Sequence, residues 1–227
     1  TTEIYTLSLH DALPISAGRH IYKREPSFPI AVACDPAFNF VYEANIRYLH
    51  HLGEVTYFSP LADTSLPDAG FVYLPGGYPE LYLAALSANR QMLQSIRRYV
   101  ESGGKLLAEC GGMMYLCDEI RDKNGDVYPM AGVLHQSATM ENMKLRLGYR
   151  TLLYNETRLK GHEFHYSRLV EQQNPLPSCA VAYTAKGVET DTPLYHYKNV
   201  WAGYTHLYWA DPVGNEWFTK FVIDGNT

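Results

Sequence analysis

Short apolar runs alternate with helix-like stretches through the first half of the chain. The strand-like runs are Ile30–Ala33, Val55–Phe58, Phe71–Leu74 and Leu106–Ala108. The stretches with helical patterns are Tyr42–Leu52, Glu80–Leu86, Asn89–Ser102 and Met113–Leu116. Strands that alternate with helices at such short intervals predict right-handed βαβ units and a parallel sheet.

The second half changes to a strand-rich pattern. Strand-like segments occur at Gly132–Leu134, Gly148–Leu153, Gly161–Leu169, Ala180–Thr184 and Val200–Trp209, and one helical pattern follows at Glu216–Val222. We therefore expect one α/β domain over residues 19–227, with antiparallel strands in its C-terminal half. Residues 1–18 show neither period and contain a stretch that resembles translated sequencing-adapter sequence, so we expect a non-native leader there.

Composition narrows the class of protein. Hydrophobic residues make up 46% and charged residues 19% of the 227 positions, which is enough for a sizeable core. The net charge of −5 and the lack of a Lys/Arg-rich run argue against a nucleic-acid partner. No apolar run is long enough to span a membrane. The four cysteines have no metal-like spacing, so we expect free thiols, no bound metal and a cytoplasmic location.

Cys110 is the first candidate for chemistry. It follows the buried run Leu106–Ala108 and precedes Gly111 and Gly112. A strand, a glycine-relieved turn and a helix together predict a nucleophile elbow with sulfur as the attacking atom. The helix N-terminus is expected to favour the thiolate. The alternative is a buried structural cysteine.

A second glycine loop follows the run Phe71–Leu74. Gly76 and Gly77 lie where that strand ends, and the Cys110 elbow lies where the next strand ends. The carboxyl ends of parallel strands border one crevice, so we expect the two loops to face each other. Backbone N–H groups of Gly76, Gly77 and Gly111 are candidates for an oxyanion hole. The alternative for Gly76 and Gly77 is a simple tight turn.

A cysteine nucleophile requires a base, and His206 is the first choice. It lies in a β-rich run that continues into aromatic residues, and His165 is the alternative. His162 and His165 are three apart, so a strand places them on opposite faces, which is a poor arrangement for one metal site. Tyr208 stands where an orienting carboxylate would follow His206. A Cys–His dyad is chemically sufficient.

The sequence contains three longer motifs, Leu74-Pro-Gly-Gly-Tyr-Pro-Glu-Leu81, Ala108-Glu-Cys-Gly-Gly-Met-Met-Tyr-Leu116 and Gly161-His-Glu-Phe-His-Tyr-Ser167. Together they resemble the cobyrinate a,c-diamide synthase family, in its C-terminal, triad-class glutamine amidotransferase domain. The segment Asp35-x-Ala-Phe-x-Phe-x-Tyr-x-x-Asn45 and Phe58-Ser-Pro60 are similar to that family too. The resemblance covers residues 28–222 and implies a flavodoxin-like, mostly parallel sheet flanked by helices.

The resemblance implies a function for each part of the candidate site. Cys110 would attack the side-chain amide of glutamine, His206 would act as its base, and Gly76 or Gly77 with Gly111 would hold the oxyanion. Ammonia would pass to an ATP-binding synthetase domain that amidates the a and c carboxylates of cobyrinate or a related tetrapyrrole. His162, Glu163, His165 and Tyr166 would line the face toward that domain or its substrate, or would form a satisfied strand network instead.

The resemblance also implies what this chain lacks. The synthetase half should carry a phosphate-binding Gly-x-x-x-x-Gly-Lys-Ser/Thr loop, and the sequence contains none. We therefore expect ATP and Mg²⁺ to belong to that absent half and expect no cofactor on this domain. A homodimer stays open, and the sequence does not name the tetrapyrrole. The competing functions are a stand-alone cysteine hydrolase of γ-glutamyl or peptide bonds and a non-catalytic docking module.

Overall fold

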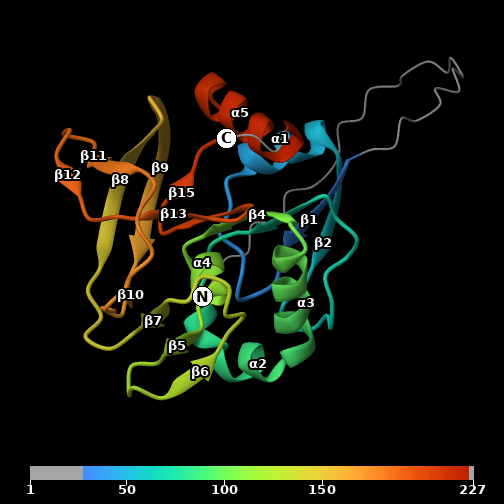
Figure 1. Ribbon diagram of the computed structural model, residues 1–227, viewed down its shortest axis with the longest axis vertical. Helices are drawn as coiled ribbons and strands as arrows, with labels where there is room; N and C mark the ends of the chain where they lie inside the picture. The colour runs from blue at the N-terminus through green and yellow to red at the C-terminus, as the bar shows by residue number, and fades with distance from the viewer. Residues whose placement is uncertain (1–27, 225–227) are drawn as a thin grey trace, which may run out of the picture.

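A six-stranded sheet lies at the centre of the computed structural model, which describes residues 28–224 (Figure 1). Its strands are β1 Pro29–Ala33, β2 Glu54–Phe58, β3 Phe71–Leu74, β4 Lys105–Glu109, β13 Leu194–Tyr197 and β14 Val200–Gly203. The order is β13-β14-β4-β3-β1-β2, with every neighbouring pair parallel except β13 and β14. The five parallel strands follow the flavodoxin-like order, which confirms the expected fold class. The expected leader over residues 1–18 lies outside the described residues.

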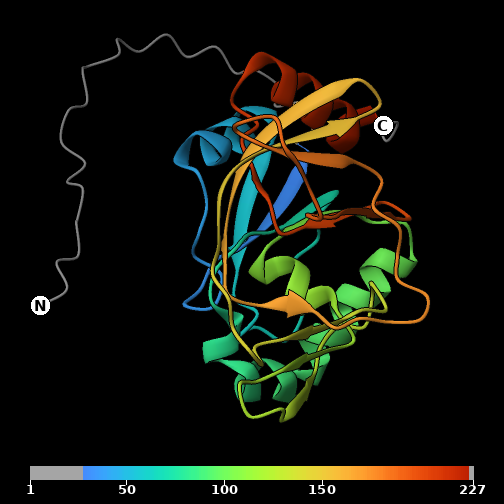
Figure 2. The ribbon, with the colours of Figure 1, turned by 90° about the vertical axis from the view of Figure 1, so that its left-hand side faces the viewer.

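Helices cover both faces of this sheet because successive strand residues point to opposite faces. Ile30, Val32 and Leu107 pack in one cluster with α5, whereas Ala31, Ala33 and Leu106 pack in a second cluster with α3 and α4. Figures 1 and 2 show α1 and α5 on one side of the sheet and α3 and α4 on the other. The helices are α1 Glu43–Leu52, α2 Leu83–Ala88, α3 Arg90–Glu101, α4 Gly111–Leu116 and α5 Pro212–Thr219, with a 3₁₀ turn at Pro79–Leu81 and a π turn at Lys220–Asp224.

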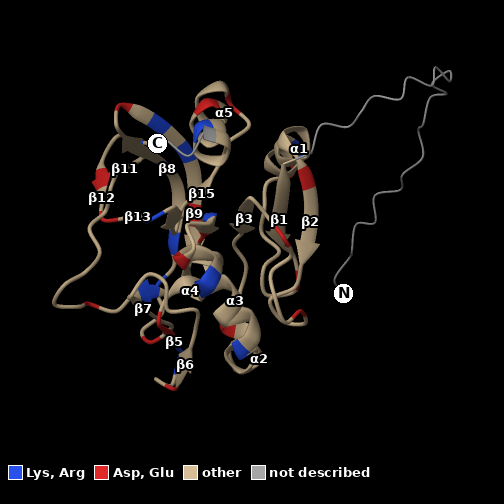
Figure 3. Ribbon diagram, turned by 45° about the vertical axis from the view of Figure 1, so that its right-hand side comes forward, with Lys and Arg blue, Asp and Glu red and all other residues tan. Residues whose placement is uncertain are grey.

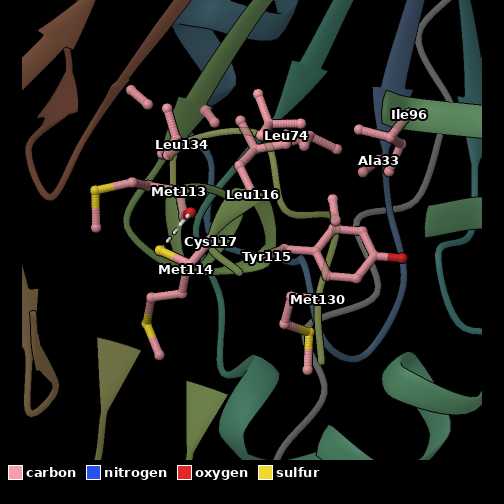
Figure 4. Packing of buried hydrophobic residues seen from close by; sticks show 14 of the residues in the cluster. Ala33, Leu74, Ile96, Met113, Met114, Tyr115, Leu116, Cys117, Met130 and Leu134 are labelled. Atoms are coloured by element: carbon pink, nitrogen blue, oxygen red, sulfur yellow. Dashed lines mark hydrogen bonds between the residues drawn. The ribbon is translucent and has the colours of Figure 1, made fainter. Parts of the chain in front are cut away.

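The helix after Cys110 is buried along its whole length. Met113, Tyr115 and Leu116 of α4 are at most 2% exposed, and Figure 4 shows them among Leu74 and Leu134 of neighbouring segments. The thiol of Cys117 donates to the Met113 carbonyl at 3.5 Å, which identifies a second buried cysteine as a packing residue. Tight packing of this kind fixes the start of α4, and with it the position of Cys110.

Two smaller sheets complete the domain. One joins β5 Glu119–Arg121, β6 Val127–Pro129, β7 Ser137–Thr139 and β10 Arg168–Leu169. The other has the order β12-β11-β8-β9-β15 and lies to the left of the central sheet in Figure 1. Its strands are β8 Arg146–Tyr154, β9 Thr157–His165, β11 Val181–Thr184, β12 Glu189–Thr190 and β15 His206–Leu207. The antiparallel pairs that we expected in the C-terminal half are therefore present.

Four expected elements differ from the structure. The predicted strand Gly161–Leu169 breaks after His165, so its two pieces belong to β9 and β10 of different sheets. The predicted strand Gly132–Leu134 is a loop, because its N–H groups cap the last carbonyls of α4 at Leu116 and Cys117. The predicted helix Glu80–Leu86 splits into the 3₁₀ turn Pro79–Leu81 and α2. The predicted strand Val200–Trp209 breaks after Gly203, so its two pieces, β14 and β15, join different sheets.

The charged residues are interspersed over the ribbon in Figure 3, with Lys and Arg beside Asp and Glu on several elements. Exposed ion pairs such as Lys220–Glu216 at 2.6 Å account for part of this mixing. Over residues 28–224, the helices are all too short or too polar to cross a bilayer.

Candidate active site

Cys110 occupies a strained turn between β4 and α4. Its backbone has φ 48° and ψ −106°, a region that non-glycine residues enter at a cost of about 1–3 kcal/mol. The Cys110 N–H donates to the Gly203 carbonyl of β14 at 2.7 Å, which secures the turn to the central sheet. A Cβ at Gly112 would lie 2.1 Å from the Leu74 oxygen, so this position requires glycine. The nucleophile-elbow geometry predicted from the sequence is therefore present.

The loop with Gly76 and Gly77 faces this elbow, as predicted. A Cβ at Gly111 would lie 3.2 Å from the nitrogen and 3.1 Å from the oxygen of Gly77. An isolated antiparallel bridge fixes this loop, because the Phe40 N–H donates to the Gly76 carbonyl at 3.0 Å. Only residues without a Cβ permit this approach, so the two glycine loops bring their backbone groups together beside the Cys110 sulfur.

A small pocket opens beside the sulfur. It is lined by Gly77, Tyr78, Glu80, Cys110, Met114, Phe164, His165, Tyr166 and Ser167. The Cys110 thiol donates to the Phe164 carbonyl at 3.8 Å. The pocket therefore lies between the nucleophile elbow and the end of β9, and it contains two of the residues for which the sequence left the role open, His165 and Tyr166.

The thiol of Cys110 is uncharged in this environment. Burial raises its pKa to about 12, and the carboxylates of Glu80, Glu109 and Glu163 raise it further, while the Gly111 N–H acts in the opposite direction. This corrects the expectation that the helix N-terminus favours the thiolate. The six-residue helix α4 does not offset burial and three nearby acids. Nucleophilic chemistry at this thiol would therefore require a base that takes its proton.

His206 provides an uncharged imidazole close to the glycine loop. A Cβ at Gly76 would lie 2.1 Å from His206 Cε1, so the ring and the loop are in direct contact. The ring packs on Phe40 at 4.3 Å and stacks on His162 at 5.7 Å between centroids. Burial lowers the pKa of His206 to about 3, with help from His162 and His165. Its buried Nδ1 has no hydrogen-bond partner among the described residues, so it is available to accept a proton.

His165 lines the pocket, but both of its ring nitrogens face oxygen atoms. Nδ1 lies 2.8 Å from the Ser167 carbonyl, and Nε2 lies 3.5 Å from a Glu163 oxygen. The ring also stacks on Tyr204 at 3.8 Å. The Nε2 atom has no hydrogen-bond partner among the described residues, so hydrogen bonding alone does not separate His165 from His206 as a base. His206 differs in lying directly against the Gly76 loop, and it stays the predicted base.

Glu163 is the anchor of a buried polar network. It accepts from Thr192 at 2.9 Å and pairs with Arg150 at 2.5 Å. Burial opposes its charge, but the hydrogen bonds from His165 and Thr192 and the Arg150 charge outweigh burial and lower its pKa. On β9, Glu163 and His165 are buried, whereas His162 is half-buried on the opposite face, as the spacing predicted. Tyr166 is exposed at the pocket rim. Glu163 and His165 thus belong to one buried polar network, in which His165 Nε2 has no hydrogen-bond partner among the described residues.

Sequence reasoning missed four residues that shape the site. Glu80 lines the pocket, Phe40 supports the His206 ring, and Glu109 and Asn45 bond to the backbone beside His206. Phe40 and Asn45 belong to the segment Asp35–Asn45, whose resemblance to the family could have marked them as site residues. Glu109 was visible as a charged residue at the end of a buried strand. Within residues 28–224, His, Cys, Asp and Glu side chains form no group of three suited to a metal ion.

Comparison with known proteins agrees with this geometry. Residues 29–213 match the CobB/CobQ-like glutamine amidotransferase domain. A hydrogenobyrinate a,c-diamide synthase from Pseudomonas aeruginosa is 40% identical over 185 residues, covering 79% of this chain and 41% of the relative. A cobyrinate a,c-diamide synthase from Fusobacterium nucleatum is 40% identical over 188 residues, with coverage of 79% and 41%. The chain thus spans about two fifths of the length of these curated relatives.

Solved structures support the fold independently. PurLQS from Thermotoga maritima superposes with a TM-score of 0.55 at 16% identity, covering 87% of this chain and 96% of that chain. Another structure, described as a glutamine amidotransferase, gives a TM-score of 0.55 at 16% identity, with coverage of 85% and 98%. At such identities the likeness concerns the fold alone, whereas the match over residues 29–213 concerns the sequence. The chain belongs to the family of CobB/CobQ-like glutamine amidotransferase domains.

Proposed function

We propose that this chain hydrolyses glutamine through a thioester on Cys110, with His206 as the general base. The observation that carries the proposal is the pairing of an uncharged thiol on a strained elbow with an uncharged, unpartnered imidazole across one glycine loop. Each group alone is unreactive in this form. Together they permit a proton to move from sulfur to nitrogen as the sulfur attacks.

The proposed reaction has two steps, formation of a thioester and its hydrolysis. His206 Nδ1 takes the Cys110 proton while the sulfur bonds to the side-chain carbonyl carbon of glutamine. The tetrahedral intermediate collapses, and the C–N bond breaks as His206 returns its proton to the leaving nitrogen. Ammonia departs and a γ-glutamyl thioester remains. Water, deprotonated by the same imidazole, then hydrolyses the thioester to glutamate and restores the thiol.

The proposal places the side-chain amide of glutamine at the pocket beside Cys110. Backbone groups of Gly77 and Gly111 approach each other next to the sulfur, where negative charge develops on the attacked oxygen. Donors placed there are worth about 3–4 kcal/mol each in enzymes where one has been removed. Glu80 on the pocket wall is a candidate for the α-amino group of glutamine, because it lines the same space.

We further propose that the ammonia serves an amidation elsewhere in the complete protein. The relatives are named for cobyrinate and hydrogenobyrinate a,c-diamide synthesis and are more than twice as long as the region matched here. In this proposal a synthetase domain binds ATP and Mg²⁺, activates tetrapyrrole carboxylates and consumes the ammonia. The four free thiols, Cys34, Cys110, Cys117 and Cys179, favour a reducing cytoplasmic compartment for the reaction.

Glutamate release by three variants tests the assignment of roles. Cys110→Ala should abolish turnover, because no thioester forms. His206→Ala should lower turnover by about 10²–10⁴-fold, the usual contribution of a general base. His165→Ala is the matched control, a second buried histidine on the same sheet, and should retain turnover within about tenfold. A larger loss in His165→Ala than in His206→Ala would show that the base has been misassigned.

A further inference from the structure

A buried carboxyl directly before the nucleophile bonds to the backbone directly after the proposed base. Glu109 is 2% exposed, and its Oε1 accepts from the Leu207 N–H at 3.0 Å. Its Oε2 accepts from the Tyr73 hydroxyl at 2.6 Å. Each carboxyl oxygen therefore accepts one hydrogen bond, and the two bonds together hold the side chain in one orientation between Tyr73 and Leu207.

The contact from Glu109 to Leu207 joins two sheets. Glu109 ends β4 of the central sheet, whereas Leu207 belongs to β15, which pairs with β9 in the sheet beside it. Cys110 and His206 thus lie on separate sheets, each one residue from an end of this hydrogen bond. A displacement of β15 relative to β4 would separate the sulfur from the imidazole, and reaction rates fall steeply with such displacement.

Asn45 also fixes the backbone on the C-terminal side of His206. The Asn45 side chain is fully buried, donates to the Leu207 carbonyl at 2.7 Å and accepts from the Trp209 N–H at 2.9 Å. Leu207 therefore has both backbone groups fixed by side chains from other elements, α1 and β4. Tyr208, at the place where an orienting acid would stand, is 38% exposed and packs edge-on against Tyr42 instead.

We propose that Glu109 is a positioning residue that sets His206 against Cys110 by fixing the Leu207 backbone, in place of a carboxylate that orients the imidazole ring. This inference rests on the proposed glutaminase function and adds a residue to it. The burial of an acid at this point supports it, because burial raises the pKa of Glu109 to about 8 despite the hydrogen bonds from Tyr73 and Leu207. An apolar side chain would fill the same space without that cost.

Two substitutions separate the acceptor from the charge. Glu109→Gln keeps an oxygen that can accept from Leu207 and an amide that can donate to Tyr73. Glu109→Leu has similar size and no acceptor. We expect Glu109→Leu to lower kcat by about 30–100-fold with KM changed less than about threefold, and Glu109→Gln to stay within about threefold of wild type in both. The rate of Cys110 alkylation by iodoacetamide should follow the same order.

The alkylation rates of Glu109→Leu and Glu109→Gln, measured in the His206→Ala background, show whether Glu109 acts through His206. Without the imidazole, Glu109→Leu should change the alkylation rate less than about twofold, because coupled residues are not additive. An equal loss in both backgrounds would overturn the proposal, since it would indicate a general structural effect. A loss in Glu109→Gln as large as in Glu109→Leu would overturn it too, because the acceptor contact would then be irrelevant.

The other cysteines provide a folding control for the alkylation experiment. Iodoacetamide should label the exposed Cys34 and leave Cys117, which is fully buried, unlabelled in every folded variant. If Glu109→Leu labels Cys117 and is therefore unfolded, the flexible Glu109→Met takes its place in both backgrounds. Alkylation reports the Cys110–His206 arrangement without glutamine. Absence of glutamine turnover in wild type would therefore overturn the proposed function, while the alkylation rates still decide the role of Glu109.

Discussion

At the scale of single residues, burial holds Cys110 and His206 in their uncharged forms. It raises the pKa of the thiol to about 12 and lowers the pKa of the imidazole to about 3. A charged pair is therefore disfavoured before substrate binds, and the proton moves only when attack on a carbonyl makes the sulfur less basic. The site therefore stores no preformed thiolate, and the reactivity of Cys110 toward any electrophile depends on a base that removes its proton.

The lowered pKa of His206 predicts acid sensitivity of the folded domain. Between pH 6.5, the usual histidine value, and about 3, the unfolded chain binds a proton at His206 that the folded chain does not. The free energy of unfolding should thus fall as the pH falls through this window, by on the order of 5 kcal/mol in total, since one pKa unit corresponds to about 1.4 kcal/mol. Urea titrations of wild type and His206→Gln over this range measure it.

His206→Gln should show a flatter dependence, because the amide does not titrate. The matched control is His50→Gln, which makes the same substitution at an exposed position of α1, away from the site. Equal slopes for His206→Gln and wild type would show that His206 titrates in the folded protein much as it does in the unfolded chain, which would contradict its burial as an uncharged base.

At the scale of elements, the antiparallel pairing of β15 with β9 determines where His206 lies. β15 has two residues and pairs His206 with His162 and Leu207 with Gly161. A Cβ at Gly161 would lie 2.3 Å from the His206 oxygen and 2.6 Å from Thr205 Cγ2, so the two strands approach more closely than other residues permit. The glycine that begins the Gly161–Ser167 motif thus serves the position of the base.

Gly161→Ala should therefore push β15 away from β9. We expect a loss of about 1–3 kcal/mol of unfolding free energy, the usual cost of forcing extra atoms into a packed site, and a fall in glutamine turnover that exceeds the loss of folded protein. Denaturant titration and glutamate release measure the two effects. Arg158→Ala, at an exposed position of the same strand, is the control and should change stability by less than about 0.5 kcal/mol. Wild-type turnover in Gly161→Ala would mean that this close approach does not position His206.

The sequence predicted elements well where local pattern determines them. The run Phe71–Leu74 became β3 with the same bounds, because a buried parallel strand is recognisable from its apolar residues alone. Gly132–Leu134 failed because a loop packed into the core carries the same apolar residues as a strand. The division of Val200–Trp209 between two sheets depends on partners in β4 and β9, which no local pattern shows.

The candidate site followed the same division. Cys110 and the glycine loops were predictable from the chain because strand ends and glycines mark them. The choice between His206 and His165 was not, since the ring contacts and hydrogen bonds of both histidines depend on the fold. The raised pKa of Cys110 also escaped prediction, because its burial and the approach of Glu80 depend on the fold.

At the scale of the whole molecule, the site lies where two sheets meet. The flavodoxin-like sheet carries Cys110 and both glycine loops, and the second sheet carries His206 and the wall of the pocket. The curated relatives extend well beyond the region matched, so turnover in this chain depends on how far the two sheets hold their arrangement alone. A probe that requires only one chemical event at Cys110 is therefore the most direct test.

That probe is a diazo ketone analogue of glutamine, with the intact-protein mass as the readout. We expect a single adduct on wild type and none on Cys110→Ala, because only Cys110 carries the reacting sulfur in this proposal. The adduct should form more slowly on His206→Ala, because His206 is the proposed base that removes the Cys110 proton. An adduct that persists on Cys110→Ala, or a folded wild-type protein that forms none, would contradict the assignment of Cys110 as a glutamine-directed nucleophile.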